Sequence, residues 1–453
     1  MSANRTGRSA PGAADMNRRQ FLLRSGTAAV AFSGAGGLLA ACSGGSPAPV
    51  SPSQQNRTPA TITVWDYYGS STPVKPALAG FKQRYPWITV NYQGLDWDTI
   101  STKFTVAVSS GSAPDVATLD MTWIPTYAST GLLMDLSKLS GGMLNRRPVK
   151  DQYSSSQLNA MSYQGHFVTM LFDEDCYGLY YRRDLFEKKG ISVPRNWQEF
   201  RAAAKALAVS TTANGKPSKY LMEIDPDTFH YASYLYQNGG AILDPTNNKA
   251  VFNSPQGVQA LEMYKGFLDD GTGIYWGPGQ GDRIAGLNSG TIAMFEDGPY
   301  YMGVMKSGAP KLSGKWGIAI APYSEKPGSY LGGTGLSIPV NAPNADAAWT
   351  FVQDLLQAKN SVGVATYSGA APGLQAALHS PQIQKPDPYF GGQNPWKEWL
   401  PTLAIATHYP YVQKWNAIDR AVADGVSAAL LGKKTPQQAL DDAAAQVNGW
   451  LAG

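Results

Sequence analysis

Thr61-Ile62-Thr63-Val64-Trp65 opens the segment of this 453-residue chain that decides the fold. This β-branched run predicts a strand, and the runs at 87–92 and 115–119 predict two more. Between them, residues 73–85 and 98–109 carry apolar side chains at helical spacing and predict two helices. A strand–helix–strand–helix–strand order favours a mostly parallel sheet with helices on its faces, so the fold class is α/β.

The same alternation continues to the C-terminus without an internal repeat or a heptad run. Further strands are predicted at 168–172, 177–181, 291–295 and 316–320. Further helices are predicted from Asn196 to Leu207 with a capping box to Glu199, from Ser254 to Leu268, from Asn344 to Leu356 and from Thr435 to Trp450. The chain is long enough for two domains of ordinary size.

Composition excludes several classes of protein. Hydrophobic residues make up 43% of the chain, which is too many for a disordered protein, and two cysteines exclude a disulfide scaffold. The net charge of +4 comes from residues 1–41, which hold five arginines and one aspartate. Beyond residue 41 Lys plus Arg falls from 37 to 32 and Asp plus Glu from 33 to 32, so the remainder is neutral. We therefore expect no nucleic-acid partner.

The N-terminus predicts export. Arg18-Arg19-Gln20-Phe21-Leu22 resembles a twin-arginine signal, and the small-residue exit Leu39-Ala40-Ala41-Cys42 resembles a bacterial lipobox. We predict a signal peptide over 1–41, an acylated Cys42 (palmitate) that anchors the chain to the outer face of the cell membrane, and a flexible tether over 42–60. Both Met1 and Met16 remain possible starts.

Motifs for several chemistries are missing from the sequence. There is no nucleophile elbow, no phosphate-binding loop and no dinucleotide fingerprint. The four histidines are more than 20 residues apart and form no helical metal pair. We therefore predict a protein that is not an enzyme and that has no cofactor and no metal.

Aromatic and acidic residues follow the predicted strands. In open α/β sheets ligands bind outside the carboxyl ends of the strands, where these residues come together. Aromatic faces suit the C–H face of a sugar ring, and carboxylates accept hydrogen bonds from its hydroxyls. The residues in these positions are Tyr67, Tyr68, Asp120, Thr122, Trp123, Asp173, Glu174, Asp175, Glu296, Asp297 and Tyr300.

Four motifs give the chain a resemblance to the extracellular sugar-binding proteins of bacterial ABC importers, the maltose-binding-protein-like group. The motifs are Ala113-Pro114-Asp115-Val116 with 127–136, Leu179-Tyr180-Tyr181 with 182–200, Gly290-Thr291-Ile292-Ala293-Met294 with Gly298-Pro299-Tyr300, and 432–440. Together they span about 61–450. Two positions depart from the family pattern: the crossing reads Tyr181-Arg182-Arg183, and the triplet Asp173-Glu174-Asp175 is unusually acidic. These departures leave a cationic or amino sugar open as the ligand.

The resemblance implies a two-lobe, periplasmic-binding-protein-like fold in which each lobe has a mostly parallel sheet and a hinge joins the lobes. It implies that 61–178 plus 337–380 form one lobe and 182–335 plus 385–453 the other. Carried over residue by residue, it implies ligand contacts at Tyr67, Tyr68, Asp120, Thr122, Trp123, Asp175, Phe229 or His230, and Tyr300. The acids of the strand end at 296–297 complete the predicted site.

The implied function is capture of a sugar or oligosaccharide between the lobes by a monomeric, lipid-anchored component that delivers it to an ABC permease. Two alternatives stay open at this point. One is an exported glycoside hydrolase that uses acidic pairs such as Glu296 and Asp175. The other is a sensory or adhesion subunit with the same fold.

Overall fold

Strands β1 (Ala60–Asp66), β2 (Ile88–Gly94) and β3 (Val116–Asp120) form the parallel part of a seven-stranded sheet, as the sequence predicts. Buried and exposed residues alternate along β1, while β3 is buried almost throughout because β1 and β16 flank it. Helices α1 (Lys75–Arg84) and α2 (Trp97–Ser109) make the crossovers between these strands. The predicted strand and helix positions in this segment are confirmed.

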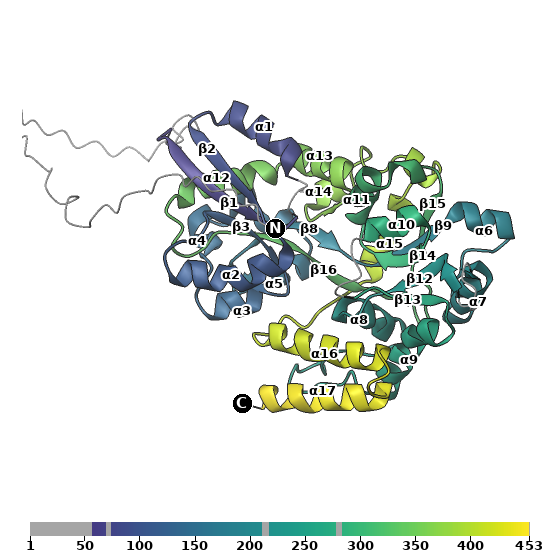
Figure 1. Ribbon diagram of the computed structural model, residues 1–453. Helices are drawn as coiled ribbons and strands as arrows, with labels where there is room; N and C mark the ends of the chain where they lie inside the picture. The colour runs from purple at the N-terminus through teal and green to yellow at the C-terminus, as the bar shows by residue number, and fades with distance from the viewer. Residues whose placement is uncertain (1–56, 69–73, 211–216, 278–282, 453) are drawn as a thin grey trace, which may run out of the picture. The chain divides into compact units, whose positions relative to one another are not determined.

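The computed structural model describes residues 57–68, 74–210, 217–277 and 283–452 (Figure 1). The predicted signal peptide, Cys42 and the tether up to residue 56 lie outside these ranges. Among the described residues, none of the helices combines the length and apolar character that crossing a membrane requires.

The rest of the first sheet is antiparallel or short. Strand β16 (Tyr330–Ser337) runs antiparallel between β3 and β8 (Met170–Asp175), β17 (Ala371–Pro372) pairs with β8, and β18 (Thr407–His408) pairs with β16. The strand order is β17-β8-β16-β3-β1-β2. The sheet is therefore mixed, because β16, which brings the chain back from the second sheet, runs against both of its neighbours, β3 and β8.

A second sheet has five strands in the order β13-β12-β14-β9-β15. Strands β12 (Leu221–Ile224), β13 (Gly273–Tyr275) and β14 (Ile292–Asp297) are parallel, and β9 (Gly178–Arg182) and β15 (Trp316–Ala319) are antiparallel to their neighbours. Neighbouring residues of β14 point to opposite faces, so Phe295 packs in one hydrophobic cluster and Met294 in the other. Each sheet thus has its own packed faces, as a two-lobe fold requires.

The chain passes between the sheets at Cys176-Tyr177 and again after β15. The predicted lobe boundaries remain a prediction, with two differences in detail. The resemblance implies that 182–335 and 385–453 form the second lobe, yet β16 pairs on both sides within the first sheet and β18 pairs with β16.

Seventeen α-helices surround the sheets in the described part of the chain, and α16 and α17 lie side by side near the C-terminus (Figure 1). Besides α1 and α2 they are α3 (Ile124–Ser129), α4 (Leu136–Ser140), α5 (Ser155–Ala160), α6 (Arg183–Lys189), α7 (Trp197–Leu207), α8 (Thr228–Gln237), α9 (Pro255–Asp269), α10 (Arg283–Ser289), α11 (Tyr301–Gly308), α12 (Ala345–Leu355), α13 (Ala358–Ser368), α14 (Gln375–Leu378), α15 (Trp396–Ile405), α16 (Trp415–Leu430) and α17 (Pro436–Leu451).

The N-termini of two helices, at Asn196 and Asn344, differ in their hydrogen bonds from what the sequence predicts. Asn196 caps α7 by accepting from the Glu199 N–H at 2.9 Å, but the Glu199 carboxylate accepts from the N–H of Arg195 rather than of Asn196. The side chain of Asn344 does not cap α12, because its amide donates to the Asp115 carboxylate at 3.2 Å. The capping box at Thr435 is complete.

Strand β16 approaches β8 so closely that a side chain does not fit at Gly333. A β-carbon there would meet the carbonyl oxygen of Asp173, and the residue has φ +146°. We expect Gly333→Ala to destabilise the protein by about 2 kcal/mol or more, because steric overlap and backbone strain add. Gly363→Ala, on an exposed position of α13 with open space around it, is the control and should be neutral or slightly stabilising. Urea unfolding measures both, and equal stabilities would contradict this packing.

Candidate functional site

A cavity of about 380 Å³ lies where the predicted strand ends of the two sheets meet. Strands β1, β3, β8 and β16 of the first sheet contribute to it, as do segments that follow β12 and β14 of the second. The lining residues are Tyr67, Tyr68, Trp97, Asp120, Asp173, Asp175, Tyr177, Phe229, Tyr300, Val304, Tyr330, Gly333 and Thr334. The cavity is thus walled by aromatic rings and three carboxylates.

The structure brings six of the predicted site residues together at this cavity. They are Tyr67, Tyr68, Asp120, Asp175, Phe229 and Tyr300. Each follows or ends a strand or lies in the first turn of the next helix, as the strand-end argument requires.

Thr122 and Trp123 are placed behind the lining rather than in it. The Thr122 hydroxyl donates to Oδ1 of Asp120 at 2.6 Å and so holds that carboxylate in place. Trp123 is 3% exposed, and its ring packs against Trp97 with the centroids 4.6 Å apart. The prediction that these two residues contact the ligand is therefore not supported by their positions, because both support the lining residues from inside the protein.

His230, Glu296 and Asp297 also lie outside the lining. Successive residues of β14 face opposite ways, so Glu296 points into the core beside Tyr234 and is 1% exposed. Asp297 forms an ion pair with Arg283. His230 Nε2 donates to the backbone carbonyl of Glu296 at 3.0 Å, and its Nδ1 lies 2.9 Å from Oδ1 of Asp227. His230 and Asp297 are therefore engaged with other protein groups, and the Glu296 side chain is buried away from the cavity lining.

Tyrosine hydroxyls hold one wall of the cavity. The Tyr68 hydroxyl donates to Oδ2 of Asp173 at 2.6 Å and lies 2.9 Å from the hydroxyl of Thr334, which is 2.5 Å from the Tyr67 hydroxyl. The backbone N–H of Thr334 donates to the other oxygen of Asp173 at 3.1 Å. Both oxygens of this carboxylate are therefore hydrogen-bonded. Burial raises the pKa of Asp173 to about 7.

Asp175 has fewer partners than Asp173. Its Oδ2 accepts from the Tyr330 hydroxyl at 2.6 Å, while Oδ1 is buried and has no hydrogen-bond partner among the described residues. The carboxylate fits because residue 298 is glycine, where a β-carbon would overlap Oδ1. Burial raises the pKa of Asp175 well above its ordinary value, and the carboxylates of Asp297, Asp173 and Asp120 raise it further.

Seven lining residues were not among the predicted contacts: Trp97, Asp173, Tyr177, Val304, Tyr330, Gly333 and Thr334. A strand period of two does identify Asp173, because it must share the face of Asp175 while Glu174 points the other way. No comparable signal marks Tyr330, Gly333 and Thr334, since a glycine-rich run does not suggest a strand.

An ionic cluster lies behind the cavity. Arg283 donates to Glu223 at 2.6 Å and to Asp225 at 2.7 Å, and pairs with Asp297. Burial alone would lower the pKa of His230, but the Asp227 and Asp225 carboxylates outweigh it and raise this pKa to about 10. The His230 ring packs on Tyr177, which lines the cavity, with centroids 4.6 Å apart. The cluster therefore supports the cavity wall, and its two cationic groups are surrounded by the acids that they pair with.

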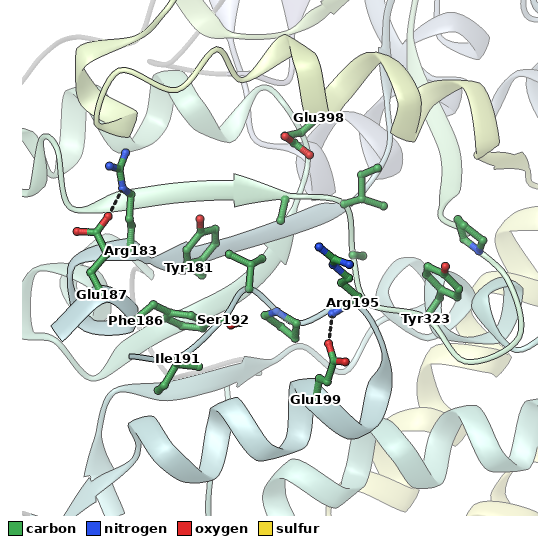
Figure 2. Close-up of a pocket in the computed structure, with 16 residues that line it drawn as sticks. Tyr181, Arg183, Phe186, Glu187, Ile191, Ser192, Arg195, Glu199, Tyr323 and Glu398 are labelled. Atoms are coloured by element: carbon green, nitrogen blue, oxygen red, sulfur yellow. Dashed lines mark hydrogen bonds and ion pairs between the residues drawn. The ribbon is translucent and has the colours of Figure 1, made fainter. Parts of the chain in front are cut away.

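A larger cavity of about 950 Å³ lies elsewhere, along β9, β15, α6 and the start of α7 (Figure 2). Two of its carboxylates are engaged within it: Arg183 pairs with Glu187 at 2.7 Å, and the backbone N–H of Arg195 donates to Glu199 at 2.8 Å (Figure 2). None of the predicted site residues lines it. The smaller cavity is therefore the candidate site. Within the described ranges, His, Cys, Asp and Glu side chains form no group of three that could hold a metal ion.

Comparison with known proteins identifies the family. The family model for bacterial extracellular solute-binding proteins matches residues 68–361. The chain belongs to this family. Among the relatives of this solute-binding protein, the diacetylchitobiose-binding protein of Streptomyces coelicolor is 25% identical over 86% of this chain and 88% of its own. The lactose-binding protein of Rhizobium radiobacter is 24% identical over 85% of this chain and 92% of its own.

Solved structures agree on the fold of this solute-binding protein. The GacH receptor of Streptomyces glaucescens, solved without ligand and with acarbose, matches with a TM-score of 0.77 and 23% identity, over 87% of this chain and 98% of that chain. The chain is thus a maltose-binding-protein-like α/β protein with two lobes, as the resemblance implied.

The buried Glu296 makes the stability of this solute-binding protein depend on pH. Burial raises the pKa of Glu296 from 4.5 to about 7. The unfolded chain therefore loses this proton first, and the stability of the fold falls as pH rises from about 4.5 to about 7. Glutamine does not ionise, so we expect Glu296→Gln to gain up to about 3 kcal/mol over wild type between about pH 4.5 and about pH 8.

Denaturant unfolding at both pH values measures this gain. Glu262→Gln, on the exposed side of α9, is the control, and its difference from wild type should be the same at both pH values. A pH-independent difference for Glu296→Gln would show that the carboxyl is not held neutral in the fold.

Proposed function

We propose that this solute-binding protein captures a sugar or oligosaccharide in the cavity around Asp120, Asp173 and Asp175 and delivers it to the permease of an ABC importer. The observation that carries the proposal is that seven aromatic side chains and three carboxylates line one cavity of about 380 Å³. Aromatic faces hold the apolar face of a sugar ring, while carboxylates accept from its hydroxyls. The volume falls in the usual range for small-molecule sites.

The named relatives support a sugar as the ligand. One binds lactose and another diacetylchitobiose, and each covers more than four fifths of this chain. In the proposed mechanism the ligand contacts residues that follow strands of both sheets, such as Tyr67 and Tyr300. A ligand held by both lobes favours the closed arrangement by its difference in affinity between closed and open forms. The closed form is then recognised by the permease.

Export and anchoring complete the proposed function. The twin-arginine-like segment Arg18-Arg19 and the lipobox before Cys42 support secretion, acylation of Cys42 and retention at the outer face of the cell membrane. A tether up to residue 60 would leave the sugar-binding part free to meet the permease.

A glycoside hydrolase needs two carboxyl groups on either side of the bond that breaks. Of the pair considered for this chemistry, Asp175 lines the cavity but Glu296 points into the core. This placement favours binding over hydrolysis. The sensory or adhesion alternative would share the cavity, so it is separated from import by measuring sugar uptake in a deletion strain.

Thermal unfolding against a panel of sugars tests the site. We expect one class of sugar to raise the melting temperature, because a ligand at about 100 times its Kd adds about 2.7 kcal/mol to the free energy of unfolding. A flat response to every sugar would overturn the proposed function.

Substitution of Tyr300 tests which cavity binds the sugar. We expect Tyr300→Ala to weaken binding of the sugar about tenfold, a loss of about 1.4 kcal/mol, because an aromatic face of the cavity is lost. Tyr323→Ala is the matched control, since Tyr323 lines the larger cavity. Isothermal titration calorimetry measures both. Loss of binding in Tyr323→Ala with full binding in Tyr300→Ala would assign the sugar to the larger cavity instead.

A further inference from the structure

The candidate cavity has an unbalanced charge. Three of its lining residues are aspartates, and none of the described residues in the lining is lysine, arginine or histidine. The charged groups that act on Asp175 are the carboxylates of Asp297, Asp173 and Asp120. Of these, Asp297 pairs with Arg283, whereas Asp120, Asp173 and Asp175 form no ion pair within the described ranges. A buried negative charge without a partner is costly.

The three aspartates differ in how far their hydrogen-bonding capacity is used. Both oxygens of Asp173 accept bonds, from Tyr68 and from the N–H of Thr334. Asp120 accepts two bonds from Thr122 on one oxygen. Asp175 accepts one bond, from Tyr330, and its Oδ1 has no partner among the described residues. Asp175 is therefore the aspartate whose carboxylate is least satisfied by hydrogen bonds within the protein.

Aromatic rings surround this carboxylate. Tyr177 meets Tyr330 edge to face, with centroids 4.6 Å apart, and Phe229 lies 5.3 Å from Tyr330. Tyr300 lines the same cavity. The faces of aromatic rings attract cations as well as the C–H groups of sugars, so this lining suits a group that is both cationic and attached to a sugar ring.

We infer that the cavity binds a sugar that carries a primary ammonium group, with the Asp175 carboxylate and the surrounding tyrosine rings holding that group. The inference rests on the proposed function and names its substrate class. A neutral sugar leaves three carboxylates enclosed without a cation, whereas an amino sugar supplies one and makes a charge-assisted hydrogen bond. Other acids of the chain do not compete, because the nearby Glu223, Asp225 and Asp297 already surround Arg283.

Three disaccharides of the same ring and linkage test the inference. They are the chitosan disaccharide, its diacetylated form and cellobiose, which carry an ammonium, an acetamide and a hydroxyl group at the same carbon. At about pH 6, below the ordinary pKa of amines, we expect the chitosan disaccharide to bind the full-length protein at least about tenfold more tightly than either of the others. Isothermal titration calorimetry measures the three affinities.

A variant and a control separate charge from shape. Asp175→Asn keeps the size of the side chain and should abolish the preference for the ammonium form. Glu398→Gln, which removes a carboxyl from the larger cavity, should leave the preference unchanged. If Asp175→Asn does not fold, the affinities of the wild-type protein alone still decide the inference.

Proton release gives an independent readout. Asp175 faces the hydroxyl of Tyr330, the rings of Tyr177 and Tyr300, and the carboxylates of its acidic neighbours, and burial raises its pKa. An ammonium group beside it should therefore cause protons to be released on binding at about pH 6, measured by titration in two buffers of different ionisation enthalpy. Cellobiose should release none. Equal proton release with both sugars would count against the inference.

The outcomes distinguish this inference from the proposed function. Binding of cellobiose or the diacetylated form as tight as that of the chitosan disaccharide would overturn the inference and leave sugar binding intact. Binding of another neutral sugar with no response to any amino sugar would do the same. Failure of every sugar would overturn both, as would binding of a linear diamine without any sugar.

Discussion

Strand β16 lies between β3 and β8 because three of its residues have no side chain. At Gly333 a β-carbon would meet the Asp173 carbonyl, and at Gly335 one would overlap the hydroxyl of Thr169. The close approach aligns Thr334 with Asp173 in the register of the two strands, and places the Tyr330 hydroxyl on Asp175. The positions of the Asp173 and Asp175 carboxylates therefore depend on glycines, which have no side chain that could contact a ligand.

This dependence also explains which parts of the fold could be predicted. Strands β1, β2 and β3 are rich in β-branched residues, and the helices between them repeat apolar residues at helical spacing, so the local pattern is enough to predict them. Strand β16 has the sequence Tyr-Leu-Gly-Gly-Thr-Gly-Leu-Ser, which has little strand propensity of its own. It forms a strand because neighbours on both sides complete its hydrogen bonds, and that information is spread over the chain. The mixed strand direction has the same origin.

The sequence predicts a lining residue of the candidate site where that residue ends a strand or directly follows one. That rule places Tyr67, Asp120 and Tyr300 at one cavity because the carboxyl ends of strands meet. It fails for Glu296 and Asp297, since nothing local reveals which face of β14 meets the core or that Arg283 lies within reach of Asp297. Burial and pairing of a carboxylate are decided by tertiary contacts.

The two sides of the Tyr177 ring differ in how their acids are paired with cations, and this difference bears on which ligand the cavity binds. On one side its ring packs on His230, where the acids Asp225 and Asp227 are balanced by the imidazolium and by Arg283. On the other side it lines a cavity in which none of the described lining residues is lysine, arginine or histidine. The fold supplies cations for the acids on the His230 side of Tyr177. Burial raises the pKa of Asp175, and a cationic ligand beside this carboxyl group would favour its charged form instead. The site therefore lacks a positive charge that a cationic ligand can supply.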